Sequence, residues 1–378
     1  MSQSLRIAWM VPGGVDRSGR ERVIPHFLWL MEELSRDHEV HVISLHQDPE
    51  PCSYPLRGAT VHGLGNIRED RPLDHEPCLA LEATMDKARE ILTARGPWDI
   101  LHGFWAFHAG WLAATLGREL HIPSVVSLLG AEFVSLPEIS YGGQTHERPR
   151  RMVAQTTERA NALTVASRFM GDLTRAQGLH PEYIPFGVPD PCFLEGLAAD
   201  HPPWRLLHVG SINRVKNQSL LLAAMQRVVA VNPDVSLDIL GMDTLQGELH
   251  SLVDCYSLTR NVSLHGYIPN DVARSFFQQA HVYLVSSLHE TGPIAMLEAA
   301  ACGVPTVGTP VGYVADWAGE RAIAVPHNDS DAMAATILEL LVDTPRRRAL
   351  GDAARDWVRR HDSRWTAENF LRLYRSLL

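Results

Sequence analysis

The amino-acid sequence predicts an α/β protein that consists of two β/α domains. Short apolar runs, typical of buried strands, alternate with segments whose apolar residues recur at helical spacing. This alternation stops in a proline-rich segment at residues 184–203 and then starts again. The length of 378 residues also fits two domains. Strands separated by helices predict parallel sheets, which bind ligands beyond the carboxyl ends of their strands, so we expect a ligand cleft between the domains.

The first domain is expected to open with a strand at residues 5–11, which runs into Gly13 and Gly14. Apolar residues at helical spacing follow at 23–34. Further strands are predicted at residues 39–45, 100–102, 124–128 and 162–166. The two glycines let the backbone approach a ligand, although their spacing differs from the GxGxxG of dinucleotide sites. A tight turn without a ligand is the alternative.

The second domain repeats the pattern after the proline-rich segment. Its strands are predicted at residues 206–209, 235–240, 262–264, 282–285 and 306–307, with a helix at 220–231. Gly210 follows the first of these strands, and Arg214 and Lys216 come shortly after it. Glycine gives a ligand access to the backbone, and the two cations can neutralise a diphosphate. A solvated pair of cations near a helix start is the alternative.

A helix that is apolar on every side is predicted between Pro293 and Gly303. Proline suits the first turn of a helix, and glycine suits its end. An all-apolar helix is buried, so Glu298 in its middle either faces an internal cleft or pairs with a lysine or arginine. Glu290 lies just before the helix, near the end of the strand at 282–285. Two carboxylates beside the N–H groups of a helix start indicate a site for a polyhydroxylated, phosphorylated ligand.

A longer motif surrounds these two carboxylates. The spacing E-x7-E from Glu290 to Glu298, followed by A-x-x-x-G-x-P as far as Pro305, resembles the signature of the retaining, nucleotide-sugar-dependent glycosyltransferases of family 4. The resemblance implies the GT-B fold, in which two facing Rossmann-like β/α/β domains enclose an interdomain cleft.

The resemblance also implies a division of labour along the chain. Residues 1–190 would form an acceptor-side domain, and residues 191–361 would form the nucleotide-sugar donor domain. The amphipathic tail at 362–378 is expected to pack back on the first domain, and a simple terminal helix of the second domain is the alternative.

Residue roles follow from the resemblance for the donor side. Lys216 takes the lysine position of the family's G-R-L-x-x-x-K-G element, whereas Ser211 stands where the family has arginine, and we expect Arg214 to compensate. Lys216, Arg214 and the helix start would then stabilise the leaving diphosphate, while Glu290 binds the donor sugar and Glu298 the ribose. The predicted catalytic residues are Glu290, Lys216 and Arg214. The predicted donor-binding residues are Gly13, Gly14, Gly210, Ser211, Tyr267, Thr291, Gly292, Pro293, Ile294 and Glu298.

The acceptor side is expected near the strand at 100–102. His102 and Trp105 belong to a segment rich in histidine and aromatic residues, for which a packed aromatic cluster is the alternative. The segment from Leu128 to Glu132 resembles the family's H-G-x-[DE] turn, with Leu129 in place of the histidine. We expect His102, Trp105 and Glu132 to line the acceptor side, with His102 as a substitute for the missing histidine.

Composition limits the other classes of function. The net charge of −10 argues against nucleic-acid binding. Five scattered cysteines without CxxC spacing fit a reducing compartment, and there is neither a signal-peptide pattern nor a run of roughly 20 apolar residues. We therefore expect a cytoplasmic protein, with peripheral contact at the inner face of a membrane left open. Asp238 and Asp243 are isolated, and the histidines lack metal-ligand spacing, so neither a metal nor another cofactor is expected.

These observations predict a retaining glycosyltransferase. It would move a hexosyl unit from a nucleotide-diphosphate sugar, with UDP or GDP as the nucleotide, to a glycan, lipid-linked or small-molecule acceptor, as in polysaccharide biosynthesis. Two other functions are kept: a different enzyme of the same architecture, either a nucleotide-sugar epimerase or a phosphorylase, and a non-catalytic nucleotide-sugar-binding protein.

Overall fold

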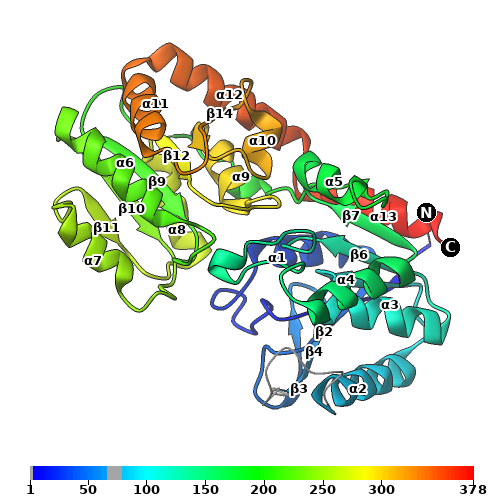
Figure 1. Ribbon diagram of the computed structural model, residues 1–378. Helices are drawn as coiled ribbons and strands as arrows, with labels where there is room; N and C mark the ends of the chain where they lie inside the picture. Colours follow the sequence, from blue (N-terminus) through cyan, green and yellow to red (C-terminus); the bar gives the residue numbers. More distant parts are fainter. Residues whose placement is uncertain (1–2, 66–78, 197) are drawn as a thin grey trace. The chain divides into compact units, whose positions relative to one another are not determined.

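The computed structural model describes residues 3–65, 79–196 and 198–378. The chain divides into two compact units (Figure 1). Unit 1 consists of Met1–Phe186 together with Ser363–Leu378, and unit 2 consists of Gly187–Asp362. The change of unit at Phe186 falls inside the predicted proline-rich segment.

Unit 1 is built on an eight-stranded sheet with the order β3-β4-β2-β1-β5-β6-β7-β8. The strands are β1 (Arg6–Val11), β2 (Glu39–Ser44), β3 (Pro51–Leu56), β4 (Ala59–Leu64), β5 (Ile100–Phe104), β6 (Ser124–Leu128), β7 (Ala162–Val165) and β8 (Glu182–Tyr183). Among the strands that the structure describes here, β3 alone runs antiparallel to its neighbour. The strand order reverses at β1, which lies between β2 and β5, and this is where open α/β sheets bind ligands.

Six α-helices and a short 3-10 helix also belong to the described residues of unit 1. They are α1 (Pro25–Leu34), α2 (Leu79–Arg95), α3 (His108–Leu120), η1 (Pro137–Ile139), α4 (Glu147–Arg159), α5 (Arg168–Arg175) and α13 (Ser363–Ser376). Helix α13, red in Figure 1, packs against α1 although more than 300 residues separate them. Its side chains Phe370 and Tyr374 are fully buried, so the end of the chain is part of the unit 1 core.

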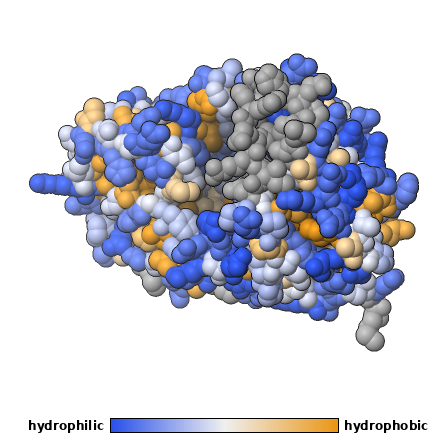
Figure 2. All heavy atoms as spheres, turned by 90° about the horizontal axis from the view of Figure 1, so that it is seen from below, coloured by the Kyte–Doolittle hydropathy of each residue, from blue (hydrophilic) through white to orange (hydrophobic). Residues whose placement is uncertain are grey.

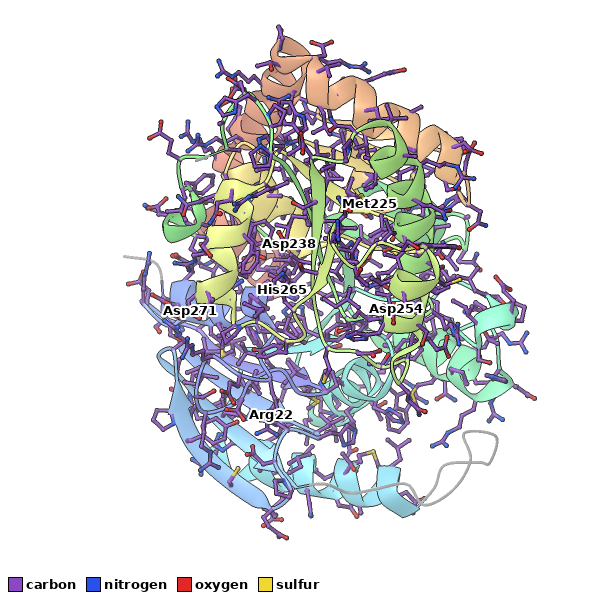
Figure 3. All side chains as sticks on the ribbon, turned by 90° about the vertical axis from the view of Figure 1, so that its left-hand side faces the viewer. Arg22, Met225, Asp238, Asp254, His265 and Asp271 are labelled. Atoms are coloured by element: carbon purple, nitrogen blue, oxygen red, sulfur yellow. The ribbon has the colours of Figure 1, made fainter. Side chains whose placement is uncertain are left out.

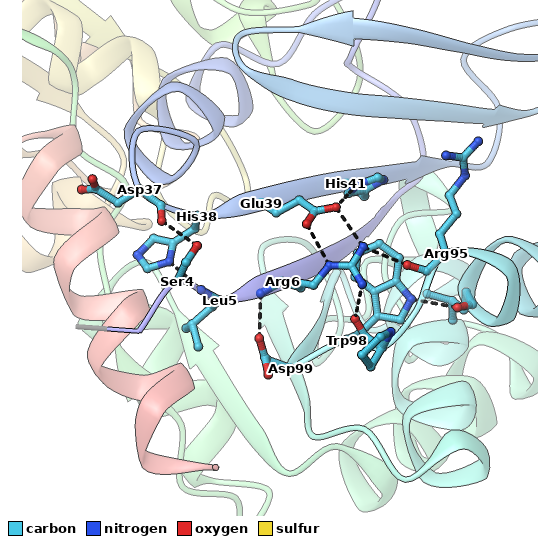
Figure 4. Close-up of polar contacts among 12 residues, drawn as sticks. Ser4, Leu5, Arg6, Asp37, His38, Glu39, His41, Arg95, Trp98 and Asp99 are labelled. Carbon is cyan, nitrogen blue, oxygen red and sulfur yellow. Dashed lines mark hydrogen bonds and ion pairs between the residues drawn. The ribbon is translucent and has the colours of Figure 1, made fainter. Parts of the chain in front are cut away.

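Arg6 ties the start of β1 to both neighbouring strands (Figure 4). Its guanidinium donates to both carboxylate oxygens of Glu39, at 2.8 and 2.9 Å, and to the carbonyl oxygens of Arg95 and Pro97. Its backbone N–H donates to Asp99 at 2.7 Å. Because Glu39 begins β2 and Asp99 immediately precedes β5, these bonds set the register of β1 between its two neighbours.

Unit 2 contains a six-stranded, wholly parallel sheet with the order β11-β10-β9-β12-β13-β14. The strands are β9 (Trp204–Val209), β10 (Val235–Leu240), β11 (Val262–Leu264), β12 (Val282–Val285), β13 (Thr306–Gly308) and β14 (Ala322–Ala324). The helices are η2 (Asp190–Cys192), α6 (Gln218–Val231), α7 (Glu248–Cys255), α8 (Asn270–Gln279), α9 (Ile294–Ala301), α10 (Tyr313–Trp317), α11 (Ser330–Val342) and α12 (Thr344–Arg360). Here β9 is the strand at which the order reverses.

Helix α9 has the burial that its apolar sequence predicts. It begins directly after Pro293, and residues 296–301 are all buried. By contrast, hydrophilic atoms cover most of the described surface on the face in Figure 2, with hydrophobic atoms in small groups among them. That mixture is ordinary for a protein surface. Within the described residues, no helix is both long enough and apolar enough to cross a membrane.

Candidate functional site

An ion pair between Lys216 and Glu290 stands at the carboxyl edge of the unit 2 sheet. Lys216 lies in the loop after β9 and Glu290 in the loop after β12, and these two strands are neighbours. The Lys216 Nζ is 2.5 Å from the Glu290 Oε1. Their side chains are 23% and 12% exposed, so solvent reaches both groups only in part. The structure thus brings together two of the three residues predicted to be catalytic.

Serine side chains hold this pair in place. The Ser287 hydroxyl donates to Glu290 Oε1 at 2.7 Å, and the Ser286 hydroxyl donates to the Lys216 carbonyl at 2.7 Å. The backbone N–H of Lys216 donates to the Asn213 carboxamide at 2.9 Å. The sequence analysis did not identify these partners. Two polar residues directly after the apolar strand β12 were the signal that could have found the serines.

The start of helix α9 lies beside the pair. Pro293 is the N-cap residue, and its side chain has no oxygen to accept from the N–H groups of the first turn. Those groups carry the positive end of the helix dipole. Gly312 adopts φ 52°, and a Cβ added there would lie 3.2 Å from the Cβ of Glu290 and from the Cδ of Pro293. Glu290, the helix start and the Gly312 turn therefore form one compact group.

Glu298 is buried in α9 and is 5% exposed. Its Oε1 accepts from the Asn270 carboxamide at 2.5 Å. Burial raises its pKa to about 7, although the Asn270 hydrogen bond and the charge of Arg274 act in the opposite direction. The sequence left open whether Glu298 faces a cleft or pairs with a lysine or arginine. In the described part of the structure it hydrogen-bonds to the Asn270 amide instead of forming an ion pair, and Arg274 acts on its pKa only through charge.

Three loops after β9, β10 and β11 follow one another along the same edge. Gly241 has φ 152°, and a Cβ there would lie 2.0 Å from the Gly210 carbonyl, so the first two loops touch through their backbones. The Gly241 N–H donates to the Gly266 carbonyl at 2.8 Å, which joins the third loop. Next to these contacts lie Ser211, which is exposed, and Tyr267, which is 47% exposed.

Asp238 has a partner within this region. Its carboxylate is 2.7 Å from the His265 Nε2, and the two side chains lie side by side in Figure 3. Among the described residues, no group of three or more His, Cys, Asp or Glu side chains has the arrangement to hold a metal ion.

Arg214, the third residue predicted to be catalytic, has a different partner in the structure. Its guanidinium pairs with Glu248 of α7 at 2.7 Å, and both side chains are more than half exposed. Arg214 is therefore not part of the Lys216–Glu290 pair, and its expected compensation for the arginine that Ser211 replaces stays a prediction. An exposed ion pair of this kind contributes only about 0–1 kcal/mol.

Gly14 in unit 1 serves a tight turn. It adopts φ 82°, its N–H donates to the Gln47 carboxamide at 2.7 Å, and a Cβ there would lie 2.5 Å from the Ile24 side chain. The turn geometry accounts for the glycine without a ligand. Donor binding by Gly13 and Gly14 stays a prediction.

His102 does not line a ligand site, contrary to the prediction. It is 0% exposed, and its ring nitrogens hydrogen-bond to the Tyr374 hydroxyl at 2.6 Å and to the Ser127 hydroxyl at 2.8 Å. Burial lowers its pKa to about 3, so the ring is neutral. It stacks on Phe104 within the aromatic core beneath α13, so the packed-cluster alternative is correct for His102.

Glu132 is also buried completely, and its predicted contact with an acceptor is wrong. Its carboxylate accepts from the backbone N–H groups of Ala106, Leu129 and Gly130, at 2.9 to 3.3 Å. Burial raises the pKa of this carboxyl. Glu132 thus joins the loop that follows β5 to the loop that follows β6 through these hydrogen bonds. Trp105, in the first of these loops, does line a pocket.

Comparisons with known proteins agree with this architecture. Residues 23–187 match the model of the glycosyl transferase 4-like domain, and residues 194–357 match that of the glycosyl transferases group 1. The D-inositol 3-phosphate glycosyltransferase of Pseudarthrobacter chlorophenolicus is 24% identical over 386 residues, which are 94% of this chain and 89% of the relative. The enzyme of the same name from Stackebrandtia nassauensis is 26% identical over 372 residues, 89% of this chain and 82% of the relative.

Solved structures show the same fold. Sucrose-phosphate synthase from Thermosynechococcus elongatus has a TM-score of 0.80 at 21% identity, with 98% of each chain covered. Anabaena HepE in complex with UDP and glucose has a TM-score of 0.74 at 14% identity, with 99% of this chain and 100% of the other covered.

The fold and the matched models define a glycosyltransferase of the GT-B class. The chain belongs to the family 4 glycosyltransferases, and the predicted fold class and enzyme class are confirmed.

Proposed function

We propose that this enzyme transfers a hexosyl unit from a nucleotide-diphosphate sugar with retention of the anomeric configuration and without an essential metal ion. The observation that carries the proposal is the Lys216–Glu290 pair beside the start of α9. It places one cation, one carboxylate and a helix N-terminus within one group.

These three features match the chemistry of a leaving nucleoside diphosphate. Negative charge develops on the diphosphate as the bond to the sugar breaks. Lys216 and the first-turn N–H groups of α9 supply fixed positive charge for it, which is electrostatic stabilisation in place of a metal. Each charge-assisted hydrogen bond of this kind contributes about 1.5–3 kcal/mol.

Glu290 has a second task in this proposal. In the present state its carboxylate neutralises Lys216, which keeps both groups satisfied while they are partly buried. A bound donor would take over Lys216 through its diphosphate and offer sugar hydroxyls to Glu290. The exchange of partners ties recognition of the sugar to binding of the phosphates.

Uridine nucleotides are the first candidates for the donor. Structures of Anabaena HepE contain UDP, UDP with glucose, or UDP-glucose, and their fold matches this chain. The relatives named above act as D-inositol 3-phosphate glycosyltransferases, so a small cyclic alcohol is one kind of acceptor in the family. For this chain, a glycan, a lipid-linked sugar and a small molecule are the proposed acceptor classes, and the cytoplasm is the proposed location.

Thermal unfolding with UDP, GDP and their sugars, in EDTA or in magnesium, tests the proposal. We expect one nucleotide series to raise Tm, equally with and without the metal. Lys216→Ala should remove the shift, whereas Arg227→Ala, which breaks an exposed ion pair on α6, should keep it. A shift that requires magnesium would contradict metal-free binding. The anomeric configuration of a product, read by NMR, decides between retention and inversion.

A further inference from the structure

Unit 1 contains a pocket of about 420 Å³ at the carboxyl ends of β5 and β6. Its walls come from the loop after β5, the loop after β6 and the first turns of α4. The volume lies within the range of about 300–1,000 Å³ that is typical of small-molecule sites. It is also at the edge where open α/β sheets bind ligands.

The walls of the pocket are built by buried polar contacts. The Glu132 carboxylate holds the backbones at Ala106 and Gly130 together, as described above. The Gly143 N–H donates to the Ala131 carbonyl at 2.7 Å, and a two-way backbone bridge joins Leu136 to Tyr141. The loop that carries Tyr141 is therefore fixed before any ligand arrives.

Two glycines show that this loop is fitted closely around aromatic side chains. A Cβ at Gly130 would lie 2.6 Å from the Cδ1 of Trp105, and a Cβ at Gly143 would lie 3.1 Å from the Cζ of Phe107. Both distances are shorter than an ordinary carbon–carbon contact of about 3.5–4.0 Å. Larger residues at either position would displace the aromatic wall.

Trp105 adopts an unfavourable backbone conformation at this place. Its φ is 63°, a region that a bulky residue rarely occupies. Its N–H donates to the Ser127 carbonyl at 2.8 Å and its carbonyl accepts from Gly110 at 3.0 Å, so the sheet and α3 hold it there. Such strain costs on the order of 1–3 kcal/mol and collects at ligand sites. This backbone conformation suits glycine or asparagine, so a tryptophan here indicates that its indole ring contacts a ligand.

The chemistry of the lining favours a flat apolar ligand. The exposed surface of the lining is mainly apolar, and Trp105, Phe107, Tyr141 and Met152 are its large apolar or aromatic side chains. The polar side chains of the lining are His108, Ser140, His146 and Arg148. A bare sugar or cyclitol carries a hydroxyl on nearly every carbon, and a mainly apolar lining can replace only a small part of the hydrogen bonds that such hydroxyls make with water. An aromatic ring loses little on leaving water, and it gains about 0.5–1.5 kcal/mol from each well-placed ring contact.

We propose that this pocket binds the non-reacting part of the acceptor and that this part is an aromatic ring, so that the preferred acceptors are aryl glycosides. The inference rests on the proposed function, because the ligand is an acceptor only if the protein transfers a sugar. Binding of the ligand to the pocket does not need the donor. Phenyl β-D-glucoside is the probe, and methyl β-D-glucoside, octyl β-D-glucoside and D-inositol 3-phosphate are the comparisons.

Calorimetry on the whole chain without nucleotide tests the pocket. We expect phenyl β-D-glucoside to bind at least tenfold more tightly than methyl β-D-glucoside or D-inositol 3-phosphate. Tyr141→Ala should weaken this binding at least fivefold and leave Tm nearly unchanged, because the Leu136–Tyr141 bridge uses only backbone groups. Tyr183→Ala, in β8 of the same unit, is the matched control and should bind as the unaltered protein does.

Three outcomes would overturn the inference: equal affinity for the phenyl and methyl glucosides, tighter binding of the octyl glucoside, or no effect of Tyr141→Ala. Failure of the proposed function has a different signature. In that case no nucleotide raises Tm, whatever the pocket binds. A nucleotide shift that Tyr141→Ala leaves intact, together with loss of phenyl glucoside binding, separates the donor site from this pocket.

Discussion

The Glu298 side chain is a carboxylate that the apolar helix α9 buries almost completely. Burial raises its pKa to about 7, well above its ordinary value of 4.5. Between these pH values the folded protein binds more protons than the unfolded chain, so the free energy of unfolding falls as the pH rises from about 4.5 to 7 and then levels off. Ionised Glu298 therefore destabilises the fold at neutral pH.

Glu298→Gln should reveal that cost. The amide keeps the oxygen that accepts from Asn270 but cannot ionise. We expect the variant to be more stable than the unaltered protein at pH 8, by on the order of 3 kcal/mol, and about equally stable at pH 4.5. Urea unfolding at the two pH values measures this difference. An unchanged pH dependence would show that Glu298 does not titrate in this range.

Lys216 and Glu290 should respond differently to substitution, because in the proposed function Lys216 binds the phosphates and Glu290 binds the sugar. Lys216→Ala removes a charge-assisted contact and should weaken UDP binding by about 10- to 150-fold. Glu290→Gln takes the negative charge away from Lys216, so UDP binding should stay equal or become tighter while transfer is lost. Calorimetry and a transfer assay measure the two effects. Equal loss of UDP binding in both variants would contradict the assigned roles.

At the residue scale, the sequence identified Lys216 and Glu290 as candidate site residues, but it predicted neither their ion pair nor the residues that support it. Glu290 and Lys216 carry a family motif, so their pattern could be recognised. Asn270 could not be found in this way, because a local pattern shows where a strand ends and not which distant residue meets Glu298 there. The prediction that His102 lines the acceptor side was wrong for a physical reason. The residue lies within a strand that is buried along its whole length, where a polar side chain forms its hydrogen bonds inside the protein.

At the scale of elements, the loops after β9 and β10 meet at a point that only glycine can occupy. A Cβ at Gly241 would lie 2.0 Å from the Gly210 carbonyl, and both positions are backbone, which cannot move aside cheaply. Gly247 offers a matched contrast. It also has a positive φ, of 89°, but nothing described lies within 4 Å of a Cβ placed there.

Gly241→Ala should therefore be much more damaging than Gly247→Ala. The second change costs only backbone strain, on the order of 1 kcal/mol. The first adds a backbone clash to that strain, so we expect a loss of about 3 kcal/mol or more together with weaker nucleotide binding. Chemical unfolding and the thermal shift with UDP measure both effects. Similar losses in the two variants would mean that the loops can separate without consequence.

Element prediction succeeded for most of the strands that alternate with helices, and it missed the hairpin of β3 and β4 and the short edge strands β8 and β14. The runs at β1, β2 and β10 are continuous or alternating apolar segments, which periodicity detects. The antiparallel strand β3 was not predicted. It contains Pro51 and Pro55, and proline is accepted in an edge strand, where one side of the backbone needs no partner.

At the scale of the whole molecule, unit 1 is formed from two separate segments of the chain and unit 2 from one. Unit 2 is one continuous segment with a hydrophobic core of its own. Unit 1 needs the last helix, since Phe370 and Tyr374 of α13 are fully buried against it and Tyr374 hydrogen-bonds to His102. Without α13, the His102 nitrogen loses its partner and the aromatic side chains around it face water. We therefore predict that unit 2, whose segment is continuous, folds alone, and that the first segment of unit 1 does not.

Expression of the two segments tests this asymmetry. We expect residues 187–362 alone to unfold cooperatively on heating and to show the same nucleotide shift as the whole chain, because the Lys216–Glu290 group and α9 lie entirely within unit 2. We expect residues 1–186 alone to lack a cooperative transition. Addition of a peptide of residues 363–378 should restore it, whereas a peptide with Phe370→Ala and Tyr374→Ala should not. A cooperative transition for residues 1–186 without the peptide would show that α13 covers a core that is already complete.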